Sequence, residues 1–172
     1  TNDKKRFEEI LINVLNKQQI DIVCFRDKES SNFQEIAKIF IKTCKEKNIK
    51  KILLNGNYLL ANKLNATGVH LTSTQFDDIK KAKELGLYVI ISCHTFEDIQ
   101  NAINNQANAV TYSPIFETPN KGTPKGIEAL KEAVDKYTNI NIIALGGIIN
   151  NKQIEQISKT KAYGFASIRY FV

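Results

Sequence analysis

Short apolar segments alternate with amphipathic helical patterns along this chain, and the alternation limits its possible folds more than any other feature. Seven apolar segments are rich in β-branched residues and nearly continuous in hydrophobicity, which is typical of parallel strands buried on both faces. They span residues 21–25, 51–54, 68–71, 88–92, 109–113, 141–145 and 164–168. Strands that alternate with helices build a parallel sheet through right-handed crossovers. The sequence therefore predicts an α/β fold.

The segments between these strands carry helix and turn signals. Apolar residues recur at helical spacing, most clearly from Phe33 to Cys44. Thr95 and Asp98 have the spacing of a capping box at a helix start. All three prolines lie between positions 114 and 124, which predicts one long loop in that stretch.

Two architectures can accommodate seven parallel strands. An open doubly wound sheet is possible, but no Gly-x-Gly-x-x-Gly turn follows any of the strands. A (β/α)8 TIM barrel requires one more strand. Residues 6–15 already have a helical pattern, so residues 1–3 resemble the loop that follows a first strand. We expect a compact TIM barrel as a single domain over residues 1–172, with the first strand missing or reduced.

Composition narrows the location and the partners of the chain. No apolar run approaches the ~20 residues that span a bilayer, and no secretory signal pattern is present, which favours the cytoplasm. Cys24, Cys44 and Cys93 lack metal-ligand spacing and are expected to be reduced thiols. The net charge of +6 is spread over many helix faces. This distribution favours an anionic small molecule over nucleic acid as the ligand. An incomplete barrel would leave apolar surface exposed, which suggests that the protein forms a homodimer.

Polar or glycine-rich residues follow every predicted strand. These positions are 26–28, 55–57, 72–74, 93–95, 114–121, 146–148 and 169–170. In a barrel, the active site lies at the C-terminal ends of the strands. The opposite ends carry Lys, Asn and Gly connections without a pattern, and this asymmetry predicts a site at the C-terminal mouth.

The turn at Gly146 and Gly147 is the predicted phosphate site. Glycines let backbone N–H groups approach an anion, and a helix that begins near Asn151 adds a favourable dipole. Arg169 follows the last strand, and its guanidinium can bind phosphate oxygens. The alternative is a tight turn that needs positive φ, beside a surface arginine.

His94 is the candidate acid–base residue, because it follows a strand and an imidazole exchanges protons near neutral pH. His70 lies within a strand and is equally well explained as a hydrogen-bonded core residue. Arg26 and Lys28 are two residues apart and can point the same way toward a carboxylate or second phosphate, or they are two solvated charges.

Carboxylates are absent from two strand ends where a hard cation would need them. No acid follows Asn55 directly, and none lies between Thr72 and Gln75. Mg²⁺ usually takes at least one carboxylate ligand. The nearest acids at the mouth are Asp27 and Glu117, so we predict neither a metal site nor a cofactor.

Several motifs together resemble the thiamine phosphate synthase/TenI superfamily. They are Arg26–Lys28, Gly68–Leu71, Ile91–His94, Pro114–Thr118 with Lys121, Gly126–Glu128 and Ala144–Ile148, in that order over nearly the whole chain. The resemblance implies a compact (β/α)8 barrel that acts in thiamine biosynthesis.

The superfamily has two branches. Its synthases join a pyrimidine diphosphate to a thiazole phosphate, with Mg²⁺ held by two aspartates at positions that correspond to Gly56 and Gln75 here. A glutamine that is usual in the family is replaced by Cys24. The TenI branch resembles this chain better, because it tends to share the Asn-Gly pair at Asn55 and a loop like Phe116–Thr118.

The resemblance to TenI implies a cofactor-independent thiazole tautomerase that uses His94 as acid–base. The implied contacts are Arg26, Lys28, Asn55, Ser92, Thr118, Asn120 and Lys121 for the substrate and Gly146, Gly147, Ile168 and Arg169 for its phosphate. The family usually has a Ser-Gly pair where this chain has Arg169 and Tyr170. The alternatives are a thiamine phosphate synthase with Mg²⁺ and a non-catalytic regulatory protein that binds a phosphorylated ligand.

Overall fold

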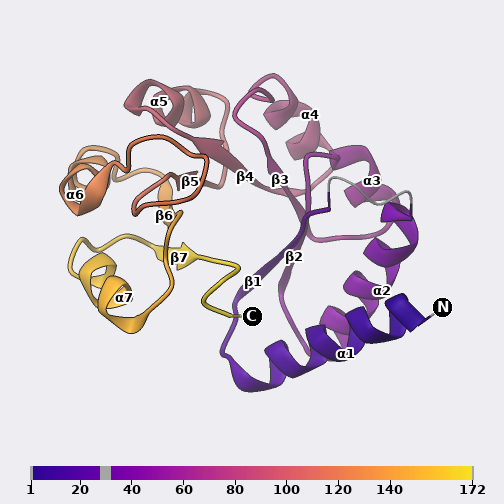
Figure 1. Cartoon of the computed structure of the whole chain (residues 1–172). Helices are drawn as coiled ribbons and strands as arrows, with labels where there is room; N and C mark the ends of the chain where they lie inside the picture. Colours follow the sequence, from indigo (N-terminus) through magenta and orange to yellow (C-terminus); the bar gives the residue numbers. More distant parts are fainter. Residues whose placement is uncertain (1, 28–31, 172) are drawn as a thin grey trace.

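Seven parallel strands form one curled sheet in the computed structural model, which describes residues 2–27 and 32–171 (Figure 1). The strands are β1 (Ile22–Phe25), β2 (Lys51–Asn55), β3 (Gly68–Leu71), β4 (Tyr88–Cys93), β5 (Ala109–Tyr112), β6 (Asn141–Leu145) and β7 (Gly164–Ala166). Each strand pairs with the next in sequence order, and among the described residues no ladder joins β7 to β1. The predicted TIM-barrel fold is confirmed, with seven strands and an opening between the first and the last.

Helices cover the outer face of this sheet (Figure 1). They are α1 (Asn2–Lys17), α2 (Phe33–Glu46), α3 (Tyr58–Lys63), α4 (Asp78–Glu84), α5 (Phe96–Asn104), α6 (Gly126–Lys136) and α7 (Asn151–Ser158). The first helix precedes β1 and packs on α2, where Thr43 Oγ1 donates to Glu8 Oε1 at 3.2 Å. Every later helix follows a strand, as the alternating pattern predicted.

Besides one-residue shifts at the ends of β1, β2, β4 and β5, three larger local details differ from the sequence prediction. Asn2 and Asp3 belong to α1 rather than to a loop, and Thr1 lies outside the described residues. The six-residue helix α3 is too short to show a hydrophobic period, but the Asn57 side chain caps it by accepting from Leu60 N. Strand β7 stops at Ala166 instead of position 168, because residues 168–171 form a turn in which Phe171 N donates to the Ile168 carbonyl.

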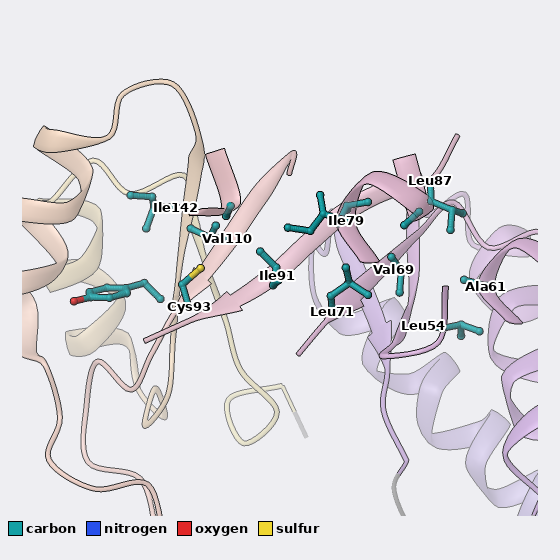
Figure 2. Packing of buried hydrophobic residues seen from close by; sticks show 14 of the residues in the cluster. Leu54, Ala61, Val69, Leu71, Ile79, Leu87, Ile91, Cys93, Val110 and Ile142 are labelled. Atoms are coloured by element: carbon teal, nitrogen blue, oxygen red, sulfur yellow. The ribbon is translucent and has the colours of Figure 1, made fainter. Parts of the chain in front are cut away.

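Side chains alternate between two apolar layers on opposite faces of the sheet. Outward residues such as Val69, Ile91 and Val110 pack against the helices in one large buried cluster, part of which Figure 2 shows. Inward residues of the strands form a smaller plug made of Leu53, Ile90, Ala109 and Ile143. The nearly continuous hydrophobicity of the strands follows from this double burial.

Candidate functional site

A polar layer lies inside the barrel, two residues closer to the C-terminal strand ends than the apolar plug. Asn55 Nδ2 donates to the backbone carbonyl of His70 at 3.0 Å. The Nε2 atom of His70 lies 3.1 Å from Ser92 Oγ and 3.2 Å from Thr111 Oγ1. The structure therefore brings together two of the predicted substrate contacts, Asn55 and Ser92, through the histidine between them.

His70 is held neutral in this layer. Burial, and to a lesser extent the positive charge of Arg26, together lower its pKa from 6.5 to about 4. Arg26 is exposed and directly follows β1. Lys28, its predicted partner, lies outside the described residues. The contacts of His70 fit the alternative of a hydrogen-bonded core residue.

The low pKa of His70 makes the fold sensitive to acid. An unfolded histidine binds a proton near pH 6.5, whereas folded His70 resists protonation down to about pH 4, so the unfolded state binds more protons between these values. Stability is therefore full above pH 6.5 and falls as the pH is lowered, by about 2 kcal/mol near pH 5. Urea unfolding at about pH 7.5 and about pH 5 should show this loss. The variant His70→Gln should lose much less, and an equal loss in that variant would exclude His70 as the source.

His94 lies at the end of β4, at the start of the loop that leads into α5. Its Nδ1 atom is 3.0 Å from the backbone carbonyl of Ser113, at the end of the neighbouring strand β5. A carbonyl only accepts hydrogen bonds, so Nδ1 carries the proton and Nε2 of the neutral ring keeps its lone pair. This tautomer leaves Nε2 ready to accept a proton from a ligand.

The capping box of α5 fixes the backbone beside this ring. Asp98 Oδ2 accepts from His94 N at 2.7 Å and from Thr95 N at 2.9 Å, while Thr95 Oγ1 accepts from Asp98 N at 3.0 Å. The predicted capping box is confirmed. It therefore ties the main chain of His94 to the helix, and the Ser113 carbonyl orients its side chain.

The loop after β5 reaches over the neighbouring strand end. Ile115 N donates to the Leu145 carbonyl and Phe116 N donates to the Gly146 carbonyl, each at 3.0 Å. Thr118 Oγ1 donates to the Phe116 carbonyl at 3.0 Å, which directs this hydroxyl back toward the start of the loop. Asn120 and Lys121 are exposed further along the loop. Thr118 is therefore close to the turn at Gly146 and Gly147. No described contact joins Asn120 or Lys121 to that turn.

Gly146 and Gly147 let this loop approach closely. Both have positive φ, +99° and +72°. A Cβ on Gly147 would lie 2.4 Å from the Glu117 carbonyl oxygen, and one on Gly146 would lie 2.8 Å from Pro114 Cα. The structural alternative for the glycine pair, a tight turn, is thus present whether or not a phosphate binds here.

The same turn has backbone N–H groups without a partner among the described residues. Among the described residues, no hydrogen bond uses the amide hydrogens of Gly147 and Ile148. Gln153 Nε2 donates to the Gly147 carbonyl at 3.0 Å and its Oε1 accepts from Ile149 N at 2.8 Å, which fixes the turn to α7. Gln153 was not among the predicted site residues, although its spacing from Asn150 is that of a helix cap.

The residues after β7 lie beside this turn. Ser167 Oγ donates to the Ile148 carbonyl at 2.7 Å and so joins the last two strand ends. Ile168 and Arg169 follow and are both exposed, and no described contact joins them to the glycines. Tyr170 OH donates to Asn151 Oδ1 at the first residue of α7. Arg169 therefore lies two residues after Ser167, which contacts the turn, but no described contact fixes the Arg169 side chain there.

The donor set at the ends of β2 and β3 does not fit the Mg²⁺ that the resemblance implies for synthases. Gly56 offers only its carbonyl oxygen, which already accepts from Gln75 Nε2 at 2.8 Å. Over residues 2–27 and 32–171, no group of three or more His, Cys, Asp or Glu side chains could hold a metal ion.

Within the same ranges, none of the helices is long and apolar enough to cross a membrane.

Comparison with known proteins agrees with this fold and this set of motifs. The family model for thiamine monophosphate synthase matches residues 1–171. A putative thiamine-phosphate synthase 2 from Aquifex aeolicus is 31% identical over 99% of this chain and 94% of its own length. A thiamine-phosphate synthase from Pelagibacter ubique is 31% identical over 83% of this chain and 70% of its own length. These names favour the synthase alternative over the tautomerase.

A solved structure has the same fold. The thiamine phosphate pyrophosphorylase from Pyrococcus furiosus superposes with a TM-score of 0.81 at 23% identity, over 93% of this chain and 78% of the other. A structure described as native KDPGal superposes with a TM-score of 0.77 at 14% identity, over 93% of this chain and 75% of the other. Because barrels of different sequence share this architecture, the fold alone does not identify the family. The family is assigned from the match of the family model to residues 1–171. The chain belongs to the thiamine monophosphate synthase family.

Proposed function

We propose that this protein is a thiazole tautomerase of thiamine biosynthesis, which binds a thiazole carboxylate phosphate and moves a proton on it with His94. The observation that carries the proposal is the bond from Nδ1 of His94 to the Ser113 carbonyl, because in a neutral imidazole it puts the proton on Nδ1 and the lone pair on Nε2. Such a base takes a proton from one position of the conjugated ring system and returns one at another. Atoms and electrons balance without an oxidant, a reductant or a metal.

The phosphate of this substrate would lie on the turn after β6. The amide hydrogens of Gly147 and Ile148 are unpaired among the described residues, and α7 begins at Asn151. Backbone donors at a helix N-terminus attract phosphate. Arg169, exposed on the adjacent strand end, can add a charged bond once an anion is bound.

The carboxylate and the ring would lie over the polar layer. Arg26 supplies a positive charge at the end of β1, and Asn55 and Ser92 line the inner face beside it. Lys28, Asn120 and Lys121 remain proposed substrate contacts. The homodimer and the cytoplasmic location also remain proposals.

A second candidate function is thiamine-phosphate synthase, which the names of both relatives favour. As the resemblance implies, that reaction joins two phosphorylated halves, releases pyrophosphate and uses Mg²⁺. Gly56 and Gln75 occupy the positions of the two metal aspartates, so this chain would need other ligands for the ion. The proton transfer of a tautomerase needs no metal ion, so it requires no ligands beyond the residues that are present.

Product analysis separates the candidates. Purified protein is incubated with the thiazole carboxylate phosphate alone, and separately with Mg²⁺, the pyrimidine diphosphate and the aromatic thiazole phosphate. We expect aromatisation in the first mixture and no thiamine phosphate in the second. Thiamine phosphate in the second mixture, with no aromatisation in the first, would replace the tautomerase with the synthase. Binding of the thiazole phosphate without turnover in either mixture would identify a non-catalytic binding protein.

A further inference from the structure

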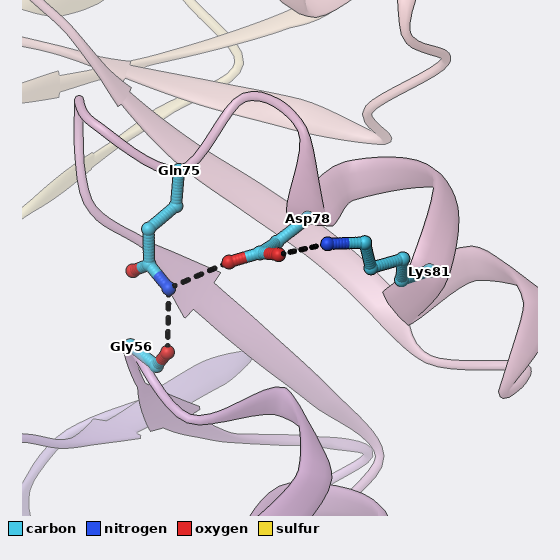
Figure 3. A network of polar contacts seen from close by, with 4 residues as sticks. All are labelled: Gly56, Gln75, Asp78 and Lys81. Carbon is cyan, nitrogen blue, oxygen red and sulfur yellow. Dashed lines mark hydrogen bonds and ion pairs between the residues drawn. The ribbon is translucent and has the colours of Figure 1, made fainter.

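The side chain of Gln75 joins the loops that follow β2 and β3 (Figure 3). Its Nε2 donates to the Gly56 carbonyl at 2.8 Å and to Asp78 Oδ2 at 3.1 Å. Its Oε1 accepts from Thr72 N at 3.1 Å and from Thr72 Oγ1 at 3.0 Å. One amide therefore connects two strand-end loops with the first turn of α4.

These four bonds use the full hydrogen-bonding capacity of the amide, which has two N–H donors and two acceptor lone pairs. They also fix its orientation. Gly56 O and Asp78 Oδ2 only accept, whereas the backbone N–H of Thr72 only donates, so the nitrogen and the oxygen cannot exchange places. Glutamate, although it has the same shape, would place an oxygen against two acceptors.

The nearest carboxylate is already engaged. Lys81 Nζ donates to Asp78 Oδ1 at 3.0 Å, and the other oxygen accepts from Gln75. The hydrogen bonds from Lys81 and from Gln75 hold the pKa of Asp78 below its ordinary value, so it is ionised and neutralised locally. Thr72 Oγ1 and Thr74 Oγ1 lie 3.1 Å apart and also contact each other. A cation here would have to break several of these bonds.

We propose that Gln75 is an amide clamp, which holds the β2 and β3 loops together as a shared cation would, and that this corner of the mouth therefore binds no divalent metal. The resemblance implies two aspartates that hold a cation at this corner. In this chain the hydrogen bonds of Gln75 join the same two loops instead, so the aspartates are replaced by another set of contacts and not simply lost. The clamp supports a metal-free tautomerase, but it rests on the contacts of Gln75 and not on the proposed function. It predicts that one atom, the amide nitrogen, decides whether the corner accepts a cation.

The test adds one negative charge at two matched positions. Gln75→Glu removes two donors and sets a carboxylate against Asp78 and the Gly56 carbonyl, which together make an oxygen set suited to Mn²⁺ or Mg²⁺. Gln100→Glu makes the same change at an exposed position of α5, where the Gln100 side chain hydrogen-bonds only Asn104 among the described residues. Melting temperature with EDTA or Mn²⁺ and Mn²⁺ binding by electron paramagnetic resonance are the two measurements.

We expect the wild type and Gln100→Glu to bind no stoichiometric Mn²⁺ and to melt at the same temperature with and without it. Gln75→Glu should melt lower in EDTA by on the order of 5–10 °C, and Mn²⁺ should restore much of that loss. Stoichiometric Mn²⁺ binding by the wild type that Asp78→Asn removes would overturn the clamp, even if Gln75→Glu does not fold. Equal melting of Gln75→Glu and Gln100→Glu in EDTA would overturn it too. Neither measurement reads turnover, so failure of the tautomerase assay is a separate result.

Discussion

Replacing His94 by asparagine is expected to lower the rate of thiazole aromatisation by about 10²–10⁴-fold, with little change in melting temperature. The asparagine amide can donate to the Ser113 carbonyl in place of Nδ1, so the local geometry is preserved. It has no group that takes up a proton near neutral pH. The rate constant kcat, measured beside the melting temperature, therefore isolates the contribution of Nε2.

His70→Gln is the matched control for this experiment. The pKa of His70 is about 4, so it does not carry a proton near neutral pH, and a glutamine amide can replace its contacts to Ser92 and Thr111. We expect this variant to keep most of the activity at neutral pH. Wild-type turnover in His94→Asn would rule out the proposed proton transfer, and an equal loss in both variants would assign the effect to the shape of the mouth.

Gly147→Ala is expected to destabilise the fold by about 3 kcal/mol or more. The added methyl group would lie 2.4 Å from the Glu117 carbonyl oxygen and 2.6 Å from the Phe116 carbonyl carbon, which are backbone atoms and cannot rotate away. The φ of +72° adds strain for any residue with a side chain. Chemical denaturation gives the free energy of unfolding directly.

Gly122→Ala measures the cost of a positive φ without a steric clash of the added methyl group. Gly122 has a similar φ of +70°, but a Cβ there would meet nothing within 4 Å. This control is expected to lose only about 1 kcal/mol, the cost of the backbone conformation alone. If both variants lose the same amount, the close approach of the loop after β5 does not explain the glycine at position 147.

The sequence was sufficient for most of the fold, because buried parallel strands leave a local pattern. Residues 68–71 and 141–145 were predicted as strands with the bounds that the structure has. Helix α3 was not predicted, since its six residues are too few for a 3.6-residue period to be visible. The turn after Ala166 was not predicted either, because Ser167 Oγ, which accepts from Tyr170 N in this turn, donates to the carbonyl of Ile148, a residue far away in the chain.

The candidate site was predictable as a set of strand ends but not as a set of contacts. The position of His94 follows from strand order, whereas the role of the Ser113 carbonyl depends on which strand lies beside β4. The missing carboxylates at Gly56 and Gln75 were visible in the sequence. The bond between these two residues was not, because side-chain bonds between loops depend on the relative register of β2 and β3.

A crystal structure of the protein with the thiazole carboxylate phosphate bound would show whether the turn after β6 and His94 form one site. We predict that the phosphate lies on the amide hydrogens of Gly147 and Ile148, and that the ring lies within hydrogen-bonding reach, about 3 Å, of His94 Nε2. A phosphate bound instead at the corner of Gly56 and Gln75 with a metal ion, or a ring that does not reach His94, would contradict this prediction.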